Sequence, residues 1–303
     1  MRAATYLRIQ TEEQGFVAID VETANPDLAS ICQIGLVSFV DGEIRASWQT
    51  LVNPENYFDP INTSIHGIEE HDVVDAPRFP EVAPAVARML GGHVVVSHMP
   101  FDRTALMRVY DRHSLPHIDC MWLDSAAVCR RAWPQFRERG YGLANVAEWC
   151  GIEFRHHNAE DDARAAGLIL VRAMRDTGLG VQDWLKRVKE PLDPSGSRSA
   201  AAISRSGNPD GPLAGESVVF TGRLLVPRRT AANLAASAGC DVATSIGKQT
   251  TILVVGDQDL RRLAGLAKSA KQRQAEELIS KGQAIRILGE SDFRAMIDEE
   301  TLG

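Results

Sequence analysis

Alternating and continuous runs of apolar residues divide the first part of the chain into short strands and longer helices. In FVAIDVET, residues 16–23, a period of two places Asp20 and Glu22 together on one face of a strand. Apolar runs at 32–40 and 93–98 predict further strands, and the segments around them predict helices. This order of elements predicts an α/β domain whose sheet has mixed strand directions.

The second part of the chain repeats this alternation on a smaller scale, after a break in the pattern. From Pro191 to Pro212, 12 of 22 residues are Pro, Ser or Gly and no apolar periodicity remains, which is typical of a flexible linker. Strand-like and helical segments then alternate again to the end of the chain. We expect a first domain at 1–185, a linker at 186–212 and a second α/β domain at 213–303.

Two predicted helices carry an acid on the stripe that should face the core. Asp102 lies in line with Leu106, four residues later, and Asp162 lies in line with Ile169, seven residues later. A buried charge is costly unless a partner or a metal compensates it. The alternative for Asp102 is stabilisation by the helix dipole alone, and for an acid pair at the end of a strand it is exposure to solvent.

The four acids Asp20, Glu22, Asp102 and Asp162 predict a metal site. They cannot all stay ionised inside a protein without cations, and ligation by oxygen alone favours Mg²⁺ or Mn²⁺ over zinc. Two such ions about 4 Å apart suit the displacement of a phosphoryl group. A histidine beside them is the natural proton acceptor, and His157 lies five residues before Asp162. Its alternative is an ordinary surface histidine.

Three short motifs give these residues a family resemblance. D-V-E-T at 20–23, H-M-P-F-D at 98–102 and H-N-A-E-D-D-A at 157–163 resemble, in order and spacing, the exonuclease motifs of the DEDDh family. That family includes the proofreading epsilon subunit of bacterial DNA polymerase III. The resemblance implies a ribonuclease-H-like fold, two Mg²⁺ or Mn²⁺ ions and release of nucleoside monophosphates from 3′ ends. The matching residues are the ligands Asp20, Glu22, Asp102 and Asp162 and the base His157, for which His156 is the rival.

The same resemblance suggests roles for three further residues, Thr23, His66 and His98. Thr23 and His66 match positions that meet the 3′-terminal nucleotide, although a strand-closing hydroxyl and a loop histidine are the alternatives. Met99 and Pro100 depart from the usual residues of the second motif. For this reason we expect His98 to have a structural or supporting role.

Residues 213–298 resemble a BRCT domain of the type found in bacterial NAD-dependent DNA ligases and in the large subunit of replication factor C. The resemblance implies a small α/β fold with a four-stranded parallel sheet. It also implies a pocket for one phosphate, either a DNA 5′-phosphate or a phosphoserine of a partner protein; the alternative is a solvated basic helix start. The pocket residues would be Thr221, Gly222, Arg229, Lys268 and Lys271.

Composition and charge then limit the possible functions. A chain with 44% hydrophobic and 24% charged residues is globular, and its apolar runs are far shorter than the ~18 residues of a membrane span, so we expect a cytoplasmic protein without a membrane partner. Five cysteines without C-x-x-C spacing favour neither disulfides nor structural zinc. Residues 1–185 hold 16 Arg, no Lys and 26 acids, a formal charge of −10, whereas residues 186–303 carry +3.

These observations predict a two-domain 3′–5′ exonuclease. Its expected substrate is single-stranded DNA 3′ ends, and the BRCT module is expected to recruit it to DNA or to a polymerase or repair complex. One alternative is an exoribonuclease similar to oligoribonuclease or RNase T, because such a site does not itself exclude the ribose 2′-OH. The other is a catalytically silent binding protein.

Overall fold

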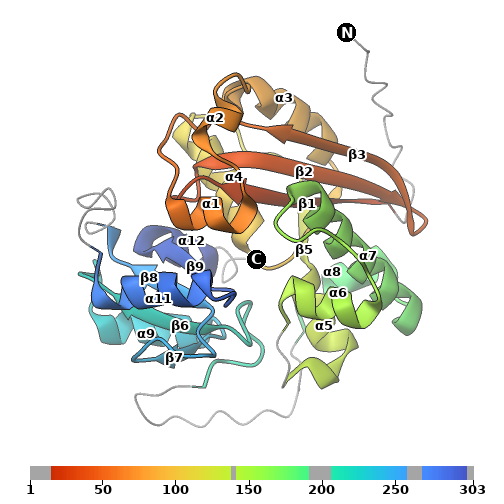
Figure 1. Cartoon of the computed structure of the whole chain (residues 1–303). Helices are drawn as coiled ribbons and strands as arrows, with labels where there is room; N and C mark the ends of the chain where they lie inside the picture. The colour runs from red at the N-terminus through yellow and green to blue at the C-terminus, as the bar shows by residue number, and fades with distance from the viewer. Residues whose placement is uncertain (1–14, 138–140, 191–205, 258–267, 299–303) are drawn as a thin grey trace.

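The computed structural model describes residues 15–137, 141–190, 206–257 and 268–298. They form two units, each built on its own sheet (Figure 1). The first sheet has five strands and the second has four. Among the described helices, none combines the length and the apolar composition that crossing a membrane requires.

The first sheet is mixed, as the pattern predicts. Its order is β3-β2-β1-β4-β5, with β1 antiparallel to β2 and parallel to β4. The central β1 therefore separates a hairpin-connected half of the sheet from a parallel half. The strands are β1 (Phe16–Thr23), β2 (Ile31–Val40), β3 (Glu43–Leu51), β4 (Val94–Ser97) and β5 (Met121–Asp124).

Helices pack around this sheet, and the longest, α7, lies across β1 and β2. The stacked rings of Phe16 and Phe39 lie beneath it, and Gly167 of α7 leaves room for Phe39. The helices are α1 (Pro60–His66), α2 (Glu70–Val73), α3 (Phe79–Leu90), α4 (Phe101–Arg112), α5 (Ser125–Ala132), the 3₁₀-helix η1 (Pro134–Arg137), α6 (Leu143–Cys150), α7 (Ala159–Thr177) and α8 (Val181–Arg187).

A glycine in β2 lets the start of α7 approach the sheet. A Cβ atom on Gly35 would lie 2.2 Å from the backbone carbon of Ala159, the first residue of α7. Gly35 is the β2 residue that pairs with Asp20 of β1. Because this close approach occurs beside Asp20, it brings the first turn of α7 to the acid pair of β1.

The second unit is a small parallel sheet with helices, as expected for residues 213–298. Its strand order is β7-β6-β8-β9, and all neighbouring strands are parallel. The elements are β6 (Ser217–Thr221), α9 (Arg228–Ser237), β7 (Asp241–Ala243), β8 (Ile252–Val255), α11 (Ala270–Ser280), β9 (Arg286–Gly289) and α12 (Glu290–Asp298).

The expected linker, residues 186–212, differs from the structure at both ends. Its first two residues belong to α8. At the other end the backbone N–H groups of Gly207 and Asn208 donate hydrogen bonds to Asp241 and to the carbonyl of Ala236. This end is therefore part of the second unit, because its polar backbone groups are satisfied there. Residues 191–205 lie outside the described residues.

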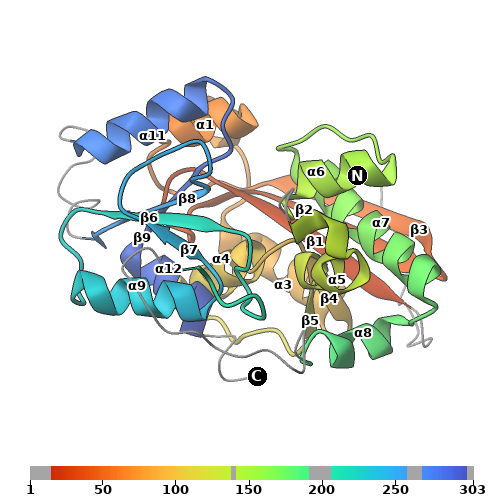
Figure 2. The same cartoon turned by 90° about the horizontal axis from the view of Figure 1, so that it is seen from below.

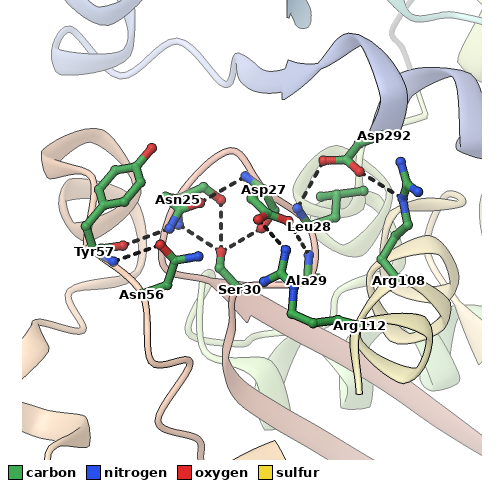
Figure 3. A network of polar contacts seen from close by, with 10 residues as sticks. All are labelled: Asn25, Asp27, Leu28, Ala29, Ser30, Asn56, Tyr57, Arg108, Arg112 and Asp292. Atoms are coloured by element: carbon green, nitrogen blue, oxygen red, sulfur yellow. Dashed lines mark hydrogen bonds and ion pairs between the residues drawn. The ribbon is translucent and has the colours of Figure 1, made fainter. Parts of the chain in front are cut away.

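The two units contact each other along the side of the first unit that carries α1 and α4. Helix α11 lies beside α1, where Ile61 and Ile65 pack against the apolar core of the second unit (Figure 2). Near α4, Asp292 of α12 accepts a hydrogen bond from the backbone N–H of Leu28 at 3.2 Å and another from Arg108 Nε at 2.9 Å (Figure 3). The Asp292 side chain is 9% exposed, so this ion pair is a buried connection between the units.

Candidate active site

Three carboxylates from two elements meet where α7 begins. Asp20 and Glu22 project from β1, and Asp162 projects from the first turn of α7. One oxygen of each carboxylate lies within 4.8 Å of the other two. The sequence-predicted face of β1 is thus the face that meets α7, which is consistent with the alternation of the strand.

Asp102 joins this site from the first turn of α4. Its side chain is 1% exposed, and Ala105 and Leu106 beside it are buried too. Its Oδ1 atom accepts a hydrogen bond from the backbone N–H of Val21, between the two acids of β1, at 3.0 Å. The Asp102 side chain therefore points inward, as the helical pattern predicts, and a hydrogen bond from β1 holds it in place.

Asp162 also organises the loop in front of α7. Its Oδ2 atom accepts a hydrogen bond from the backbone N–H of His157 at 2.9 Å, and its Oδ1 atom lies 3.1 Å from His156 Nδ1. The two imidazole rings stack with centroids 3.9 Å apart. His157 has a φ of 65°, a left-handed conformation that is uncommon outside glycine. Both candidate bases are therefore beside Asp162, which the sequence spacing alone could not show.

Asn158 is the N-cap of α7, and its side chain accepts a hydrogen bond from the backbone N–H of Asp161. The Asp161 carboxylate pairs with Arg164 at 3.0 Å. Asp161 is thus turned toward the outside of the helix. The neighbouring residue Asp162 carries the inward carboxylate, as the pattern predicts.

Burial and mutual repulsion disfavour the ionised acids. Burial raises the pKa of Asp20 well above its usual value, and the charges of Asp102 and Asp162 raise it further. Burial likewise raises the pKa of Glu22 to about 8 and that of Asp102 to about 7. Because all of these groups favour the protonated state in the absence of compensation, the site calls for positive charge.

A divalent cation fits this donor set. Every acid offers carboxylate oxygens, the ligands that Mg²⁺ and Mn²⁺ prefer. The Oδ2 atom of Asp102 is buried and has no hydrogen-bond partner among the described residues, a situation that costs about 1–3 kcal/mol when nothing compensates it. A cation held by Asp20, Glu22, Asp102 and Asp162 would satisfy this oxygen and lower the repulsion between the acids.

Thr23 and His66 lie together at the end of β1. His66 Nε2 donates to the carbonyl of Thr23 at 3.2 Å, and His66 Nδ1 accepts from the N–H of Ile68 at 3.0 Å. Burial lowers the pKa of His66, so the ring is neutral and both nitrogens are used by the backbone. Asn62 also donates to the Thr23 carbonyl. The structure therefore brings these predicted residues together, with His66 bracing Thr23.

Both ring nitrogens of His98 have hydrogen-bond partners. Its Nε2 atom donates to the carbonyl of Tyr141 at 2.7 Å, since a carbonyl oxygen can only accept. Its Nδ1 atom lies 2.8 Å from the Ser125 hydroxyl. Burial lowers the pKa of His98, which keeps the ring neutral. The side chain connects the end of β4 to α5 and leaves no nitrogen free for chemistry.

The proposed phosphate pocket of the second unit is assembled differently from the prediction. Helix α9 begins at Arg228, and this residue, not the expected Arg229, donates to the carbonyls of Phe220 and Gly222. Lys271 donates to the same Phe220 carbonyl at 3.1 Å. The arginine beside Lys271 is therefore Arg228, because Arg228 and Lys271 donate to the same carbonyl oxygen.

Of the other predicted pocket residues, two lie at the end of β6 and two do not contribute to a pocket there. The Thr221 hydroxyl lies 2.9 Å from the Ser269 hydroxyl, near the start of α11, and Gly222 has a φ of 73°. The Lys268 amine, in contrast, forms an ion pair with Glu276 at 2.6 Å. Arg229 is exposed on α9. Thr221, Gly222 and Lys271 thus gather at the end of β6, whereas Lys268 is already paired.

One residue near the site was missed at the level of the sequence. Arg286 lies in AIRIL, an apolar strand segment with no chemical motif. In the structure its guanidinium lies over the ring of Phe101, with Cζ 4.4 Å from the centroid. No signal in the sequence places these two residues together, because they belong to different units.

We expect Gly35→Ala to disrupt the acid cluster, although Gly35 is not itself one of its residues. The added Cβ would meet the backbone of Ala159, which a side-chain rotation cannot relieve, so the start of α7 must move away from β1. The expected cost is about 1–3 kcal/mol of unfolding free energy and a large loss of activity. Urea unfolding and metal titration test this, with Gly91→Ala as a glycine control away from the acids. Unchanged metal affinity in Gly35→Ala would show that the close approach does not matter.

The chain is similar to several known proteins. A family model described as an exonuclease (RNase T) matches residues 17–170, about half of the chain. DNA polymerase III PolC-type from Thermotoga petrophila is 26% identical over 194 residues, which are 60% of this chain and 14% of that relative. The PolC-type protein of Caldanaerobacter subterraneus is 28% identical over 166 residues, 54% of this chain and 12% of the relative. This chain thus spans less than a sixth of the length of these curated relatives.

Among solved structures, the zinc-bound form of the E. coli ExoI–ssDNA complex shares the fold. The TM-score is 0.50 at 13% sequence identity, and the similarity covers 58% of this chain and 43% of that chain.

Proposed function

The chain belongs to the exonuclease family whose model matches residues 17–170, and from this premise we propose that it is a metal-dependent 3′–5′ exonuclease that releases nucleoside monophosphates from DNA ends. The observation that carries the proposal is the meeting of Asp20, Glu22 and Asp162 within 4.8 Å, with two histidines on Asp162. Such a cluster is costly without cations and suits phosphodiester hydrolysis when they are bound.

The residues divide the work. Asp20, Glu22, Asp102 and Asp162 would hold the divalent cations, which would supply an acidified water and stabilise charge on the phosphate. His157 would accept a proton from the attacking water. Burial lowers the pKa of His157 to about 4, so its imidazole is neutral at neutral pH. Thr23, braced by His66, lies at the end of β1 where the terminal nucleotide would rest.

DNA is the preferred substrate in this proposal. The support is the name of the curated relatives, DNA polymerase III PolC-type, whose matches cover 54% and 60% of this chain. This chain matches only 14% and 12% of the length of those relatives, so a polymerase partner is part of the proposal. The rival activity is that of an exoribonuclease, since nothing in the cluster of acids discriminates against a ribose 2′-OH.

Gel assays with single strands labelled at the 5′ end test this function. The full chain is incubated with DNA or RNA of one sequence, in Mg²⁺, in Mn²⁺ and in EDTA. The expected result is a ladder of shortened labelled products on DNA in either metal and none in EDTA. Faster degradation of RNA would replace the proposal by exoribonuclease activity. Intact substrate in every lane would support a silent binding protein.

We also propose that the second unit is a BRCT module that binds a DNA 5′-phosphate or a phosphorylated partner. The four-stranded parallel sheet supports this fold, and Thr221, Gly222 and Lys271 at the end of β6 support the phosphate site. One phosphate gives weak, salt-sensitive binding, which suits tethering. Affinity for oligonucleotides with and without a 5′-phosphate, measured at low salt in Glu22→Gln, tests the site, and equal affinities would redirect the test to phosphopeptides.

A further inference from the structure

Arg286 brings a positive charge from the second unit to the active site of the first. It is the first residue of β9, the edge strand of the parallel sheet. Its Cζ atom lies 4.4 Å from the centroid of the Phe101 ring, and Phe101 directly precedes Asp102 in α4. A guanidinium over an aromatic face is attracted by the electrons of the ring. The contact therefore holds a cation beside one of the four acids.

The field of this cation reaches the whole site. Burial raises the pKa values of Asp102, Glu22 and Asp20, and the charge of Arg286 opposes that rise in all three. The same charge contributes to the lowered pKa of His157, after burial and the neighbouring His156. Arg286 therefore lies within electrostatic range of the proposed ligands and the proposed base, although it belongs to the other unit.

The hydrogen-bond donors of Arg286 are available for a ligand. The residue is exposed, and among the described residues its guanidinium makes the contact with Phe101 but no hydrogen bond or ion pair. Other arginines near the interface are already used, since Arg108 pairs with Asp292 and Arg130 pairs with Asp124. Arg286 thus combines a fixed position with five unused N–H donors.

The nuclease unit on its own has the wrong charge for a polyanion. Residues 1–185 carry a formal charge of −10. Cations bound by the four acids compensate that cluster, but the phosphates further along a nucleic-acid strand would still face an acidic domain. A guanidinium recognises a phosphate with two parallel hydrogen bonds, which a lysine cannot reproduce.

We propose that Arg286 is a substrate-binding residue of the exonuclease site, and that its guanidinium binds a backbone phosphate upstream of the 3′-terminal nucleotide. This inference rests on the proposed function. The second unit then completes the substrate channel of the first. Its docking contacts, Asp292 with Arg108 and Leu28 and the packing of α11 on Ile61 and Ile65, position Arg286 at the mouth of the site.

The test compares Arg286→Ala, Arg286→Lys and Arg175→Ala in the full chain. Arg175 is a matched control: it is a weakly paired, exposed arginine, 4.0 Å from Glu43. At 1.5 Å per residue it lies roughly 20 Å along α7 from Asp162. Two substrates are used, a single-stranded oligonucleotide and the nitrophenyl ester of a nucleoside 5′-monophosphate, which has one phosphate and no upstream strand.

For the oligonucleotide, Arg286→Ala is expected to raise KM about tenfold or more with kcat little changed, because a charged hydrogen bond to the substrate is lost. Arg286→Lys should recover part of this loss, and Arg175→Ala should behave like the unaltered chain. Turnover of the nitrophenyl ester should stay the same in all variants. The slope of log KM against log salt concentration should also fall by about 0.7 in Arg286→Ala.

Three results would overturn the inference. An unchanged KM would remove Arg286 from the substrate path. Faster cleavage in Arg286→Ala would mean that the arginine shields the acids instead of binding substrate. An equal loss on the ester would place its effect on the reacting phosphate and the cations. If the unaltered chain cleaves neither DNA nor RNA in the gel assays, the proposed function itself fails, which is a different outcome.

Asp292→Asn gives a second, independent variant. It weakens the buried ion pair that docks α12 near α4, without touching Arg286. We expect it to raise KM for the oligonucleotide in the same direction, and we expect Arg286→Ala to add little on that background. Fully additive effects of the two substitutions would contradict the role of docking in positioning Arg286.

Discussion

Asp20→Asn, Glu22→Gln, Asp102→Asn and Asp162→Asn are each expected to abolish metal-dependent cleavage without unfolding the protein. Each substitution removes a charge that the cations need, while the amide keeps the size of the side chain and, at Asp102, the acceptor for the Val21 N–H. Gel assays in Mg²⁺ and Mn²⁺ measure the loss. Asp161→Asn is the control, since Asp161 is the next residue on the helix but pairs outward with Arg164.

The same variants should be at least as stable as the unaltered chain when metal is absent. Burial raises the pKa of Glu22 to about 8 and of Asp102 to about 7, so between about pH 4.5 and pH 8 the folded state binds more protons than the unfolded state. Stability of the metal-free protein must therefore fall as pH rises through this window. Melting temperatures in EDTA at pH 5 and pH 8 should show a smaller fall for Glu22→Gln than for the unaltered chain.

For the cleavage assays, retained turnover in any two of the four variants would overturn the metal-site assignment.

His157→Ala is expected to lose on the order of 10²-fold or more in kcat while metal binding persists, because a positioned base is removed. His156→Ala should lose far less. Burial lowers the pKa of His157 to about 4, so the ring is neutral at neutral pH. His156 is more exposed, at 40% of its side chain, and its Nδ1 atom is occupied by Asp162.

The two histidine variants are best measured side by side, with metal affinity followed by calorimetry. Each histidine is a control for the other, because both rings lie side by side at Asp162. If His156→Ala proved the more damaging change, the roles of the two residues would have to be exchanged. The backbone bond from His157 to Asp162 survives both substitutions, so the loop should keep its place.

Several features of the site followed from local pattern. The alternation of β1 placed Asp20 and Glu22 on one face, and the helical spacing directed Asp102 and Asp162 inward. The N-cap at Asn158 also follows from local pattern, because a short polar side chain just before a helix accepts a hydrogen bond from a free backbone N–H of the first turn. These predictions succeeded since periods of 2 and 3.6 are properties of the backbone and need no knowledge of distant contacts.

Other features could not be derived in this way. The N–H of Val21 holds Asp102 across 81 residues of sequence. Gly35 is required because a Cβ atom there would clash with the backbone of Ala159. The sequence around Gly35 does not predict this contact. The arginine at the end of β6 was misassigned by one residue. Arg228 and Arg229 are chemically equivalent in the sequence, and only the fold shows that Arg228 donates to the carbonyls of Phe220 and Gly222.

Local patterns in the sequence predict the chemistry that we propose: which acids face inward, which histidines accompany them, and that a second α/β unit follows the first. How those groups are held and charged depends on the tertiary structure. The approach of α7 to β1, the stacking of two histidines and the arrival of Arg286 at Phe101 all depend on segments that meet only after the chain has folded. The physical reason is that periodicity is local, whereas repulsion between acids and its compensation depend on distances in space.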